Sequence, residues 1–416
     1  MPSSKNYLLS ITIIGVLFFI FGFITWINGT LIPYLKIACE LQTDVQAYLV
    51  ATAFFIAYTV MAIPSSMVLK KTGYKKGMAI GLFVMAIGAI IFVPAAHTRD
   101  YNLFLIGLFV IGSGLALLQT ASNPYVAIIG PIESAAMRIS IMGVCNKVAG
   151  IIASFVFGYI ALKDADVLIQ NLQTMDAATK AATLNELASR VVVPYIIIAI
   201  ALATLAVGVL FSALPDINDE NPSEEISSHQ NKTSVFQFPH LILGVLALFL
   251  YVGVEVMAGD TIINYGKSIG IELSTARYFT QGTLACMLMG YIVGIVAIPK
   301  YISQSAALKY SAVLGVVLTV AAVLTTGYVS VAFIALLGLA NSLMWPAIFP
   351  LAIDGLGKFT KIGSALLIMA IAGGAILPLI YAQLSATMGT RAAYIVMAPC
   401  YVYIFYYAVK GHKMGK

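Results

Sequence analysis

Long apolar segments recur along this chain, and one polar stretch near the middle separates them into two groups. Each segment reaches the length of about 20 residues that a helix needs to cross a bilayer. The segments begin near Leu9, Val45, Gly77, Leu103, Ser140, Val191, Leu241, Phe279, Lys309, Val331, Gly363 and Ala392. Because the chain is 61% hydrophobic and only 10% charged, a water-soluble fold is excluded. The pattern predicts an all-α membrane protein with twelve transmembrane helices.

The polar stretch and the basic residues predict the domain organisation and the topology. Residues 215–238 are acidic, contain Pro and lack helical periodicity, which is typical of a solvated linker between six-helix bundles at 1–214 and 239–416. The basic residues on one side of the predicted spans are Lys70, Lys71, Lys75, Lys76, Arg138, Lys232, Lys300, Lys358, Lys361, Lys410, Lys413 and Lys416. Basic loops stay in the cytoplasm, so both termini and the linker should be cytoplasmic. On the outer side, residues 164–190 alternate apolar and polar residues and predict a short amphipathic helix.

Other classes of function find no support in the residue pattern. The net charge of +6 follows from the basic loops that set topology, so nucleic-acid binding is not indicated. The four cysteines are scattered through apolar sequence without a CxxC pair, which favours neither disulfides nor a zinc site. No nucleophile, base and orienting group occur together, so we expect neither an enzyme nor an organic cofactor.

The fourth predicted span carries polar residues just before Pro124. Gln119 and Asn123 are four residues apart and share one helical face. Polar side chains inside a bilayer are costly unless they face a cavity or another helix. Amides both donate and accept hydrogen bonds, as neutral sugar hydroxyls require. The two residues therefore predict either the wall of a polar binding cavity or a contact between helices, and Asn123 could also satisfy a carbonyl that Pro124 frees.

Both tryptophans lie away from the ends of the predicted spans, where an interfacial position would place them. Trp345 follows Asn341 by four residues, so these two side chains share a predicted helical face. Aromatic rings stack on the apolar face of hexoses while amides bind the hydroxyls. Trp26 and Trp345 are therefore candidate contacts for a ligand with an apolar face and hydroxyl groups, with core packing as the alternative for each ring.

Ionisable residues inside the predicted spans are functional candidates, because a charge in the bilayer is costly. Lys147 lies in the fifth span, and Glu255 and Asp260 lie in the seventh. Glu255 is turned about 140° from Asp260 around the helix, whereas Asn264 shares the Asp260 face. Together with Thr261 and Asn264, Asp260 would supply oxygen ligands for Na⁺, or it could carry a proton. A structural ion pair with Lys147 is the alternative.

The two halves share a sequence pattern, which favours two related bundles that rock about a central site. NPYVAIIGPIESAAMRIS at 123–140 and FPLAIDGLGKFTKIGS at 349–364 each contain a Pro, an apolar turn, a Gly, a basic residue and a closing Ser. Further motifs are NGTLIP at 28–33, QTASNPYVAIIGP at 119–131, NKVAG at 146–150 and NSLMWPAIFPLAIDGLGKFTKIGSALLIMAIAGGAI at 341–376. Together these resemble the fucose permease and glucose/galactose transporter branch of the major facilitator superfamily, over essentially the whole chain.

This resemblance implies a monomeric, multi-pass symporter of monosaccharides in the bacterial inner (plasma) membrane, driven by protons or Na⁺. Asn146 is similar to a sugar-contacting Asn of the fucose permease. Asp354, Lys358 and Lys361 resemble the contacts that latch the cytoplasmic side of such transporters, although a solvated loop is the alternative.

The chain also departs from that family pattern. Gly29 stands where the family has a first-span Asp that the fucose permease uses in proton coupling, and Gln119 replaces a Glu of that permease. Tyr291 replaces an expected Arg in the eighth span. These departures put fucose specificity and the two-carboxylate proton route in doubt.

We therefore expect uptake of a hexose or N-acetylhexosamine by alternating access, with the lipid bilayer, a monosaccharide and a coupling cation as partners. The expected sugar contacts are Trp26, Gln119, Asn123, Asn146, Asn264, Gln281, Asn341 and Trp345. Asp260 is the expected coupling residue and Glu255 the second choice, with Na⁺ preferred because the proton-carrying pair is absent and no His replaces it. A sugar sensor that does not pump and a proton-driven exporter of amphipathic compounds are the alternatives.

Overall fold

A computed structural model describes residues 4–129, 134–162, 164–212 and 233–415, and in this part of the chain every regular element is a helix. The N-terminal half contains α1 (Ser4–Trp26), α2 (Asn28–Ala38), α3 (Asp44–Thr98), α4 (Tyr101–Ile128), α5 (Ala135–Leu162), α6 (Ala165–Leu172), α7 (Ala177–Ser189) and α8 (Val192–Phe211). The C-terminal half contains α9 (Pro239–Asp260), α10 (Ile262–Ser268), α11 (Leu273–Ala276), α12 (Phe279–Ala297), α13 (Gln304–Leu324), α14 (Gly327–Asn341), α15 (Met344–Ile353), α16 (Thr360–Met369), α17 (Gly373–Met388), α18 (Thr390–Ala393) and α19 (Met397–Val409).

The α3 helix accounts for two of the predicted spans. The described residues contain 11 helical segments that are long and apolar enough to cross a membrane. One of them, α3, has 55 residues, which at 1.5 Å per residue is about 80 Å and far more than one bilayer requires. Its backbone leaves the helical region at Gly73, where φ is 74° and ψ is 174°. A positive φ is readily adopted by Gly, so α3 folds back there and the predicted twelve spans are present.

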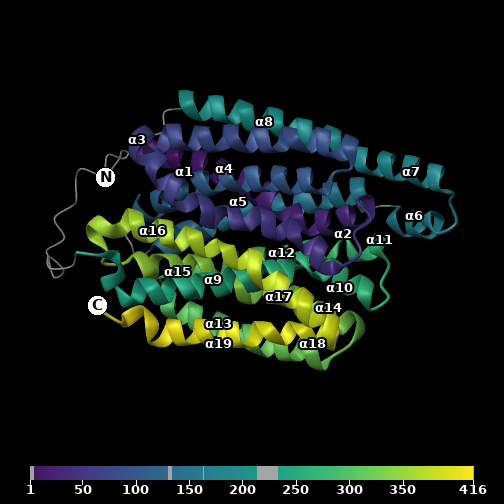
Figure 1. Cartoon of the computed structure of the whole chain (residues 1–416). Coiled ribbons are helices and arrows are strands. Elements are labelled where there is room, and N and C mark those ends of the chain that lie inside the picture. Colours follow the sequence, from purple (N-terminus) through teal and green to yellow (C-terminus); the bar gives the residue numbers. More distant parts are fainter. Residues whose placement is uncertain (1–3, 130–133, 163, 213–232, 416) are drawn as a thin grey trace.

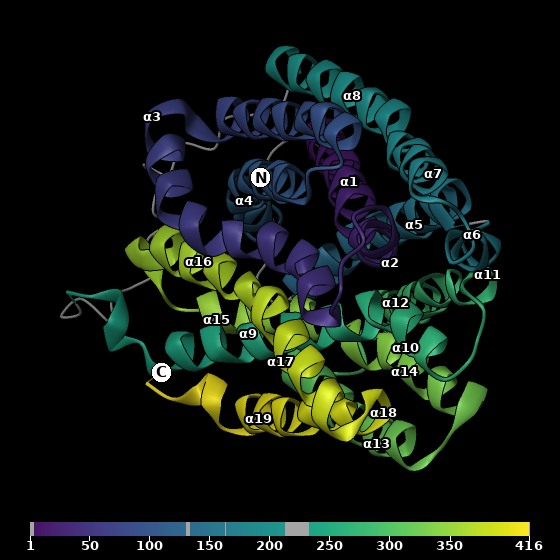
Figure 2. The ribbon, with the colours of Figure 1, turned by 45° about the vertical axis from the view of Figure 1, so that its right-hand side comes forward.

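The two halves form separate bundles that lie side by side (Figure 1). Both ends of the described chain lie at the left-hand end of this view, and α6 and α7 lie at the opposite end. The turned view places α12 of the C-terminal half beside α5 of the N-terminal half (Figure 2), and these two helices form an extensive contact. The central cavity described below lies between the bundles.

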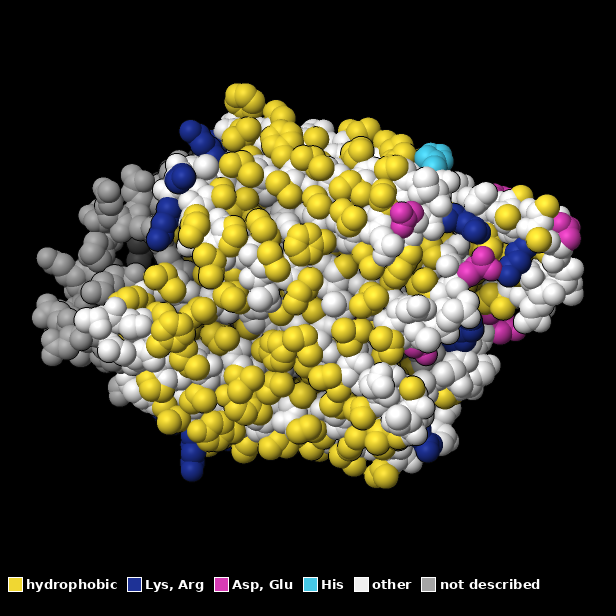
Figure 3. Space-filling view, viewed as in Figure 1, with side chains coloured by type: hydrophobic (Ala, Val, Ile, Leu, Met, Phe, Trp, Pro, Cys, Tyr) yellow, Lys and Arg dark blue, Asp and Glu magenta, His cyan; other side chains and the backbone are white. Residues whose placement is uncertain are grey.

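The surface matches a membrane protein. Hydrophobic side chains form a broad band across the molecule, and charged side chains gather toward its two ends (Figure 3). Side chains such as Ile197 and Val317, which are 60% and 57% exposed, would contact lipid. The apolar band thus follows the long helices, as the hydrophobic segments predict.

Several spans are broken along their length, among them the first, the seventh and the tenth. The first breaks at Ile27 between α1 and α2, the seventh at Thr261 between α9 and α10, and the tenth between α14 and α15. In the tenth span, Pro346 has no N–H to donate to the Ser342 carbonyl, which explains that break. In the seventh, the Thr261 hydroxyl donates to the Met257 carbonyl at 2.7 Å, a contact that bends helices. Broken helices of this kind line the sites of many transporters.

The segment from Asp164 to Arg190 is two helices, not the single amphipathic helix that its periodicity suggests. The first, α6, ends at Leu172, and Asp176 caps α7, accepting from the Ala178 and Thr179 amides at 3.0 Å each. The Thr179 hydroxyl and the backbone hydrogen bonds lower the pKa of Asp176. Arg190 closes the hairpin through a bidentate ion pair with Asp164 at 2.6 and 2.8 Å. Asp176 interrupts the helical pattern because its side chain competes for the backbone amides.

Candidate functional site

A cavity of about 100 Å³ lies between the two bundles, near the breaks in spans one, seven and ten. Its walls come from α1, α3, α4 and α5 of the N-terminal half and from α9, α12 and α15 of the C-terminal half. Eight residues expected at the site line it: Trp26, Gln119, Asn123, Asn146, Lys147, Glu255, Asp260 and Trp345. The fold thus brings together residues from five separate spans around this cavity.

Lys147 and Glu255 form an ion pair across the interface between the bundles. Lys147 Nζ lies 2.9 Å from Glu255 Oε1, and the two side chains are only 6% and 12% exposed. The Lys147 ammonium also lies 4.3 Å from the centroid of the Trp26 ring. A buried charge is tolerated when it is paired and hydrogen-bonded, so each residue depends on the other for its ionised form.

Asp260 is the second acid of the cavity and has a different environment. Its side chain is buried, and among the described residues its Oδ1 has no hydrogen-bond partner. The charged groups that interact with it electrostatically are Glu255 and Lys147. Since Lys147 already pairs with Glu255, the described wall contains two carboxylates and one ammonium. Ionised Asp260 would therefore leave one uncompensated negative charge in this cavity.

The breaks in the first and seventh spans pack directly against each other. A Cβ added to Gly29 would lie 3.1 Å from Asp260 Oδ1 and 3.4 Å from the Thr280 hydroxyl oxygen. A Cβ added to Gly259 would lie 2.4 Å from Trp26 Cζ3. The two glycines thus allow Asp260 and the Trp26 ring to lie at the contact between the halves.

Trp26 is held from the N-terminal half. Its Nε1 donates to Asn146 Oδ1 at 3.1 Å, and its backbone carbonyl accepts from the Ser154 hydroxyl at 3.1 Å. A Cβ at Gly150 would lie 2.5 Å from the ring, so this Gly makes room for the indole. The Asn146 amide therefore positions Trp26 as well as lining the cavity.

Gln119 and Asn123 have different surroundings on α4. Gln119 Nε2 donates to the Tyr58 hydroxyl at 3.0 Å, at the cavity wall. Asn123 Nδ2 instead donates to the Gln119 backbone carbonyl at 3.1 Å. Its Oδ1 is buried without a partner in the described structure. Both amides of α4 therefore line the cavity, where Gln119 contacts Tyr58, while the Nδ2 of Asn123 bonds within its own helix.

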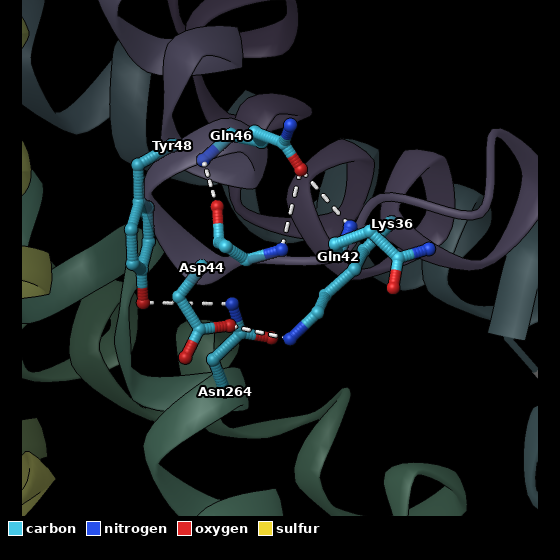
Figure 4. A network of polar contacts seen from close by, with 7 residues as sticks. Lys36, Gln42, Asp44, Gln46, Tyr48 and Asn264 are labelled. Atoms are coloured by element: carbon cyan, nitrogen blue, oxygen red, sulfur yellow. Dashed lines mark hydrogen bonds and ion pairs between the residues drawn. The ribbon is translucent and has the colours of Figure 1, made fainter. Parts of the chain in front are cut away.

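Asn264 and Thr261 do not surround Asp260. Figure 4 shows Asn264 close to Tyr48 and to the ion pair of Lys36 with Asp44. Asn264 Nδ2 lies 3.5 Å from the Tyr48 hydroxyl, a contact that joins the two halves. The Thr261 hydroxyl lies 2.6 Å from the Tyr394 hydroxyl. Thr261 and Asn264 thus have other contacts in this structure, and Asn264 is not among the residues that line the cavity. The expected Na⁺ site at Asp260, Thr261 and Asn264 stays a prediction.

Asn341 and Gln281 also lie outside the cavity. The Tyr401 hydroxyl donates to Asn341 Oδ1 at 2.8 Å within the C-terminal bundle. The break between α14 and α15 separates Asn341 from Trp345, which faces the cavity with its ring 5.9 Å from that of Phe349. Gln281 lines a different groove, between α5 and α12, beside Phe155 and other lipid-facing side chains. Asn341 and Trp345 share a predicted helical face, but of these two only Trp345 lines the cavity.

The expected latch at the cytoplasmic end is described only in part. Asp354 follows α15, and its backbone carbonyl contacts His240 Nε2 at 3.0 Å. The side chains of Lys358 and Lys361 lie outside the described residues. Their role as gating residues therefore stays a prediction.

Several cavity residues carried no signal in the sequence. Tyr58, Tyr251 and Tyr291 all line the cavity, and Thr280 lies against Gly29. A tyrosine inside an apolar span has the same pattern whether it packs in the core or faces a cavity. Only Tyr291 could have been singled out, because it replaces an expected Arg.

Comparison with known proteins identifies the family. The model of the Major Facilitator Superfamily matches residues 14–369. The chain is 36% identical to the glucose/galactose transporter of Brucella abortus biovar 1 (strain 9-941), over 99% of this chain and 96% of that protein. It is 30% identical to the L-fucose-proton symporter of Escherichia coli (strain K12), over 97% and 93% of the two chains.

The fold agrees with these sequence matches. A crystal structure of the E. coli fucose:proton symporter superposes on this chain with a TM-score of 0.77 at 29% identity. The superposition covers 97% of this chain and 98% of that chain. The chain therefore belongs to the major facilitator superfamily, in the branch that contains the glucose/galactose transporters and the fucose–proton symporter.

Proposed function

We propose that this protein takes up a monosaccharide by cation symport, and that Asp260 carries the coupling charge. The relatives named above are a glucose/galactose transporter and a fucose–proton symporter. The cavity of this chain combines the amide of Gln119 with the rings of Trp26 and Trp345, groups that suit a hexose. A hexose or an N-acetylhexosamine is the expected substrate class.

The imbalance of charge in the cavity is the observation that carries the coupling proposal. Lys147 and Glu255 neutralise each other at 2.9 Å, whereas Asp260 Oδ1 has no partner among the described residues. Burying an uncompensated carboxylate is unfavourable, so a bound proton or cation would stabilise this arrangement of the cavity wall. Uptake of the cation would thus be linked to closure of the two bundles around the sugar.

The surroundings of Asp260 favour a proton over the Na⁺ that the sequence suggests. Na⁺ requires several oxygen ligands, but Thr261 contacts Tyr394 and Asn264 contacts Tyr48. The nearby Thr280 hydroxyl donates to the Gly259 carbonyl at 2.8 Å. A proton binds to a single oxygen and needs no further ligands. Asp260 Oδ1, which has no partner among the described residues, could hold it.

Transport by proteoliposomes tests the proposal directly. Purified protein is assayed for accumulation of labelled glucose, galactose, mannose and N-acetylglucosamine, with pH and Na⁺ gradients imposed separately. We expect accumulation under a pH gradient in the wild type. Asp260→Asn should lose accumulation but keep sugar exchange across the membrane without a gradient. Accumulation at the wild-type level in Asp260→Asn would refute the coupling role.

The same assay separates the alternatives. A sensor would bind sugar and show neither accumulation nor exchange. An exporter of amphipathic compounds would show no specific sugar binding and would be inhibited by apolar cations instead. Sugar accumulation driven by a Na⁺ gradient alone would support symport but would contradict the assignment of the proton as the coupling cation.

A further inference from the structure

Tyr58 lies next to Gln119 in the wall of the cavity. The Tyr58 side chain comes from α3 and Gln119 from α4, and Gln119 Nε2 donates to the Tyr58 hydroxyl oxygen at 3.0 Å. The two helices approach closely here, since a Cβ at Gly112 would lie 2.3 Å from the Phe54 carbonyl oxygen. This close helix contact places the phenol and the amide side by side.

The position of the Tyr58 ring is determined by its neighbours. Its residue is 1% exposed, and its centroid lies 6.2 Å from that of Phe54 and 6.3 Å from that of Phe55. A ring packed in this way holds its hydroxyl in one place, so the hydroxyl can recognise a ligand at low entropic cost.

The hydrogen-bonding capacity of the pair is only partly used. The Tyr58 oxygen accepts from Gln119, and among the described residues its own O–H has no acceptor. Gln119 Oε1 likewise has no donor in the described structure. The neighbouring Asn123 Nδ2 donates to the backbone carbonyl of Gln119 and not to its side chain. The cavity wall therefore presents one free donor, the Tyr58 O–H, beside one free acceptor, Gln119 Oε1.

We propose that Tyr58 is a specificity-determining residue, and that Tyr58 and Gln119 together hold one hydroxyl group of the substrate. That hydroxyl accepts from the Tyr58 O–H and donates to Gln119 Oε1. The inference rests on the proposed sugar-transport function and deepens it. A hydroxyl can make both bonds, whereas an ionised carboxylate or an ether oxygen only accepts and an ammonium only donates. The pair therefore selects a ligand that presents a neutral hydroxyl group at this point of the cavity.

Binding of deoxy sugars to the purified full-length protein tests this assignment. The hexose that wild type binds most tightly is compared with each of its monodeoxy analogues. We expect removal of one hydroxyl to lower affinity about tenfold more than removal of any other, because that hydroxyl loses its hydrogen bonds to both Tyr58 and Gln119. In Tyr58→Phe, the penalty at that position alone should shrink, while the other penalties stay. Gln119→Leu should likewise reduce the affinity penalty of the sugar that lacks the hydroxyl at that position.

Tyr34→Phe is the matched control. The Tyr34 hydroxyl donates to the Leu187 carbonyl at 2.7 Å, within the N-terminal half and away from the cavity. This variant should leave the pattern of deoxy penalties unchanged. A Tyr58→Phe protein that binds sugar with the wild-type pattern would overturn the role of Tyr58 and leave sugar transport intact. Failure of the wild type to bind any monosaccharide would overturn the proposed function and this inference together.

Discussion

Lys147 of α5 and Glu255 of α9 form an ion pair of 2.9 Å that crosses the interface between the two bundles. The pair lies in the wall of the central cavity, beside the Trp26 ring and Asp260. In the proposed transport cycle the bundles separate on one side, so substrate binding in the cavity would influence this charged contact between them.

Replacing only one member of the Lys147–Glu255 ion pair should destabilise the protein more than replacing both members. Lys147→Met or Glu255→Gln leaves one buried charge without its partner, which costs about 3–5 kcal/mol in such pairs. The double variant removes both charges and should recover much of that loss. Thermal unfolding in detergent of the two single variants and the double variant measures the coupling. Additive losses would show that the two charges act independently.

Asp260→Asn should be at least as stable as the wild type, although it is expected to lose coupled transport. Replacing a buried carboxylate that lacks a partner by a neutral amide removes a desolvation cost of about 1–3 kcal/mol. The unfolding midpoint at neutral pH checks this expectation. Glu255→Gln provides the contrast, since its carboxylate has Lys147 as a partner. A marked loss of stability in Asp260→Asn would mean that its carboxylate is satisfied in the folded protein.

Asp166 should help to hold the two bundles together at the end where α6 and α11 lie. Its carboxylate accepts from the backbone amides of Leu273 and Ser274 at 2.9 and 2.8 Å, joining α6 to α11 of the other half. Asp166→Ala removes both hydrogen bonds. We expect the distance between spin labels at the exposed Gln170 and Glu272 to broaden toward longer values.

Asp176→Ala is the control for this effect. Asp176 caps α7 through the same kind of bonds, but both partners belong to its own half. Losing this cap should cost about 0.5–2 kcal/mol locally without changing the distance between the halves. An equal change of the spin-label distance in both variants would contradict a contact specific to Asp166.

Gly259→Ala should displace Trp26. The new Cβ would lie 2.4 Å from the indole Cζ3, a separation that the packed ring cannot accommodate without moving. Overpacking of this kind costs about 1–3 kcal/mol, and the shifted ring should also weaken sugar binding. Gly208→Ala is the control, since no atom lies within 4 Å of its added Cβ. Thermal unfolding and the tryptophan emission spectrum measure both variants, and similar behaviour of the two would contradict the contact.

The twelve spans could be predicted from the sequence because crossing a bilayer requires long apolar helices. The expected beginnings near Val45 and Gly77 lie on the two sides of the Gly73 kink in α3. The sequence also located the polar residues of the spans, since each is costly in lipid. Six of these, including Lys147, Glu255 and Asp260, line the cavity.

Which polar residues meet was decided only by the tertiary structure. Helical periodicity relates residues within one helix, so it placed Asn341 with Trp345 and Asn264 with Asp260. The breaks after Asn341 and at Thr261 separated both pairs, and Tyr401 and Tyr48 became the partners of the two amides. The pairing of Lys147 with Glu255, and that of Gln119 with Tyr58, depends on how helices distant in sequence pack. That packing also leaves Asp260 as the carboxylate whose Oδ1 lacks a partner in the described structure.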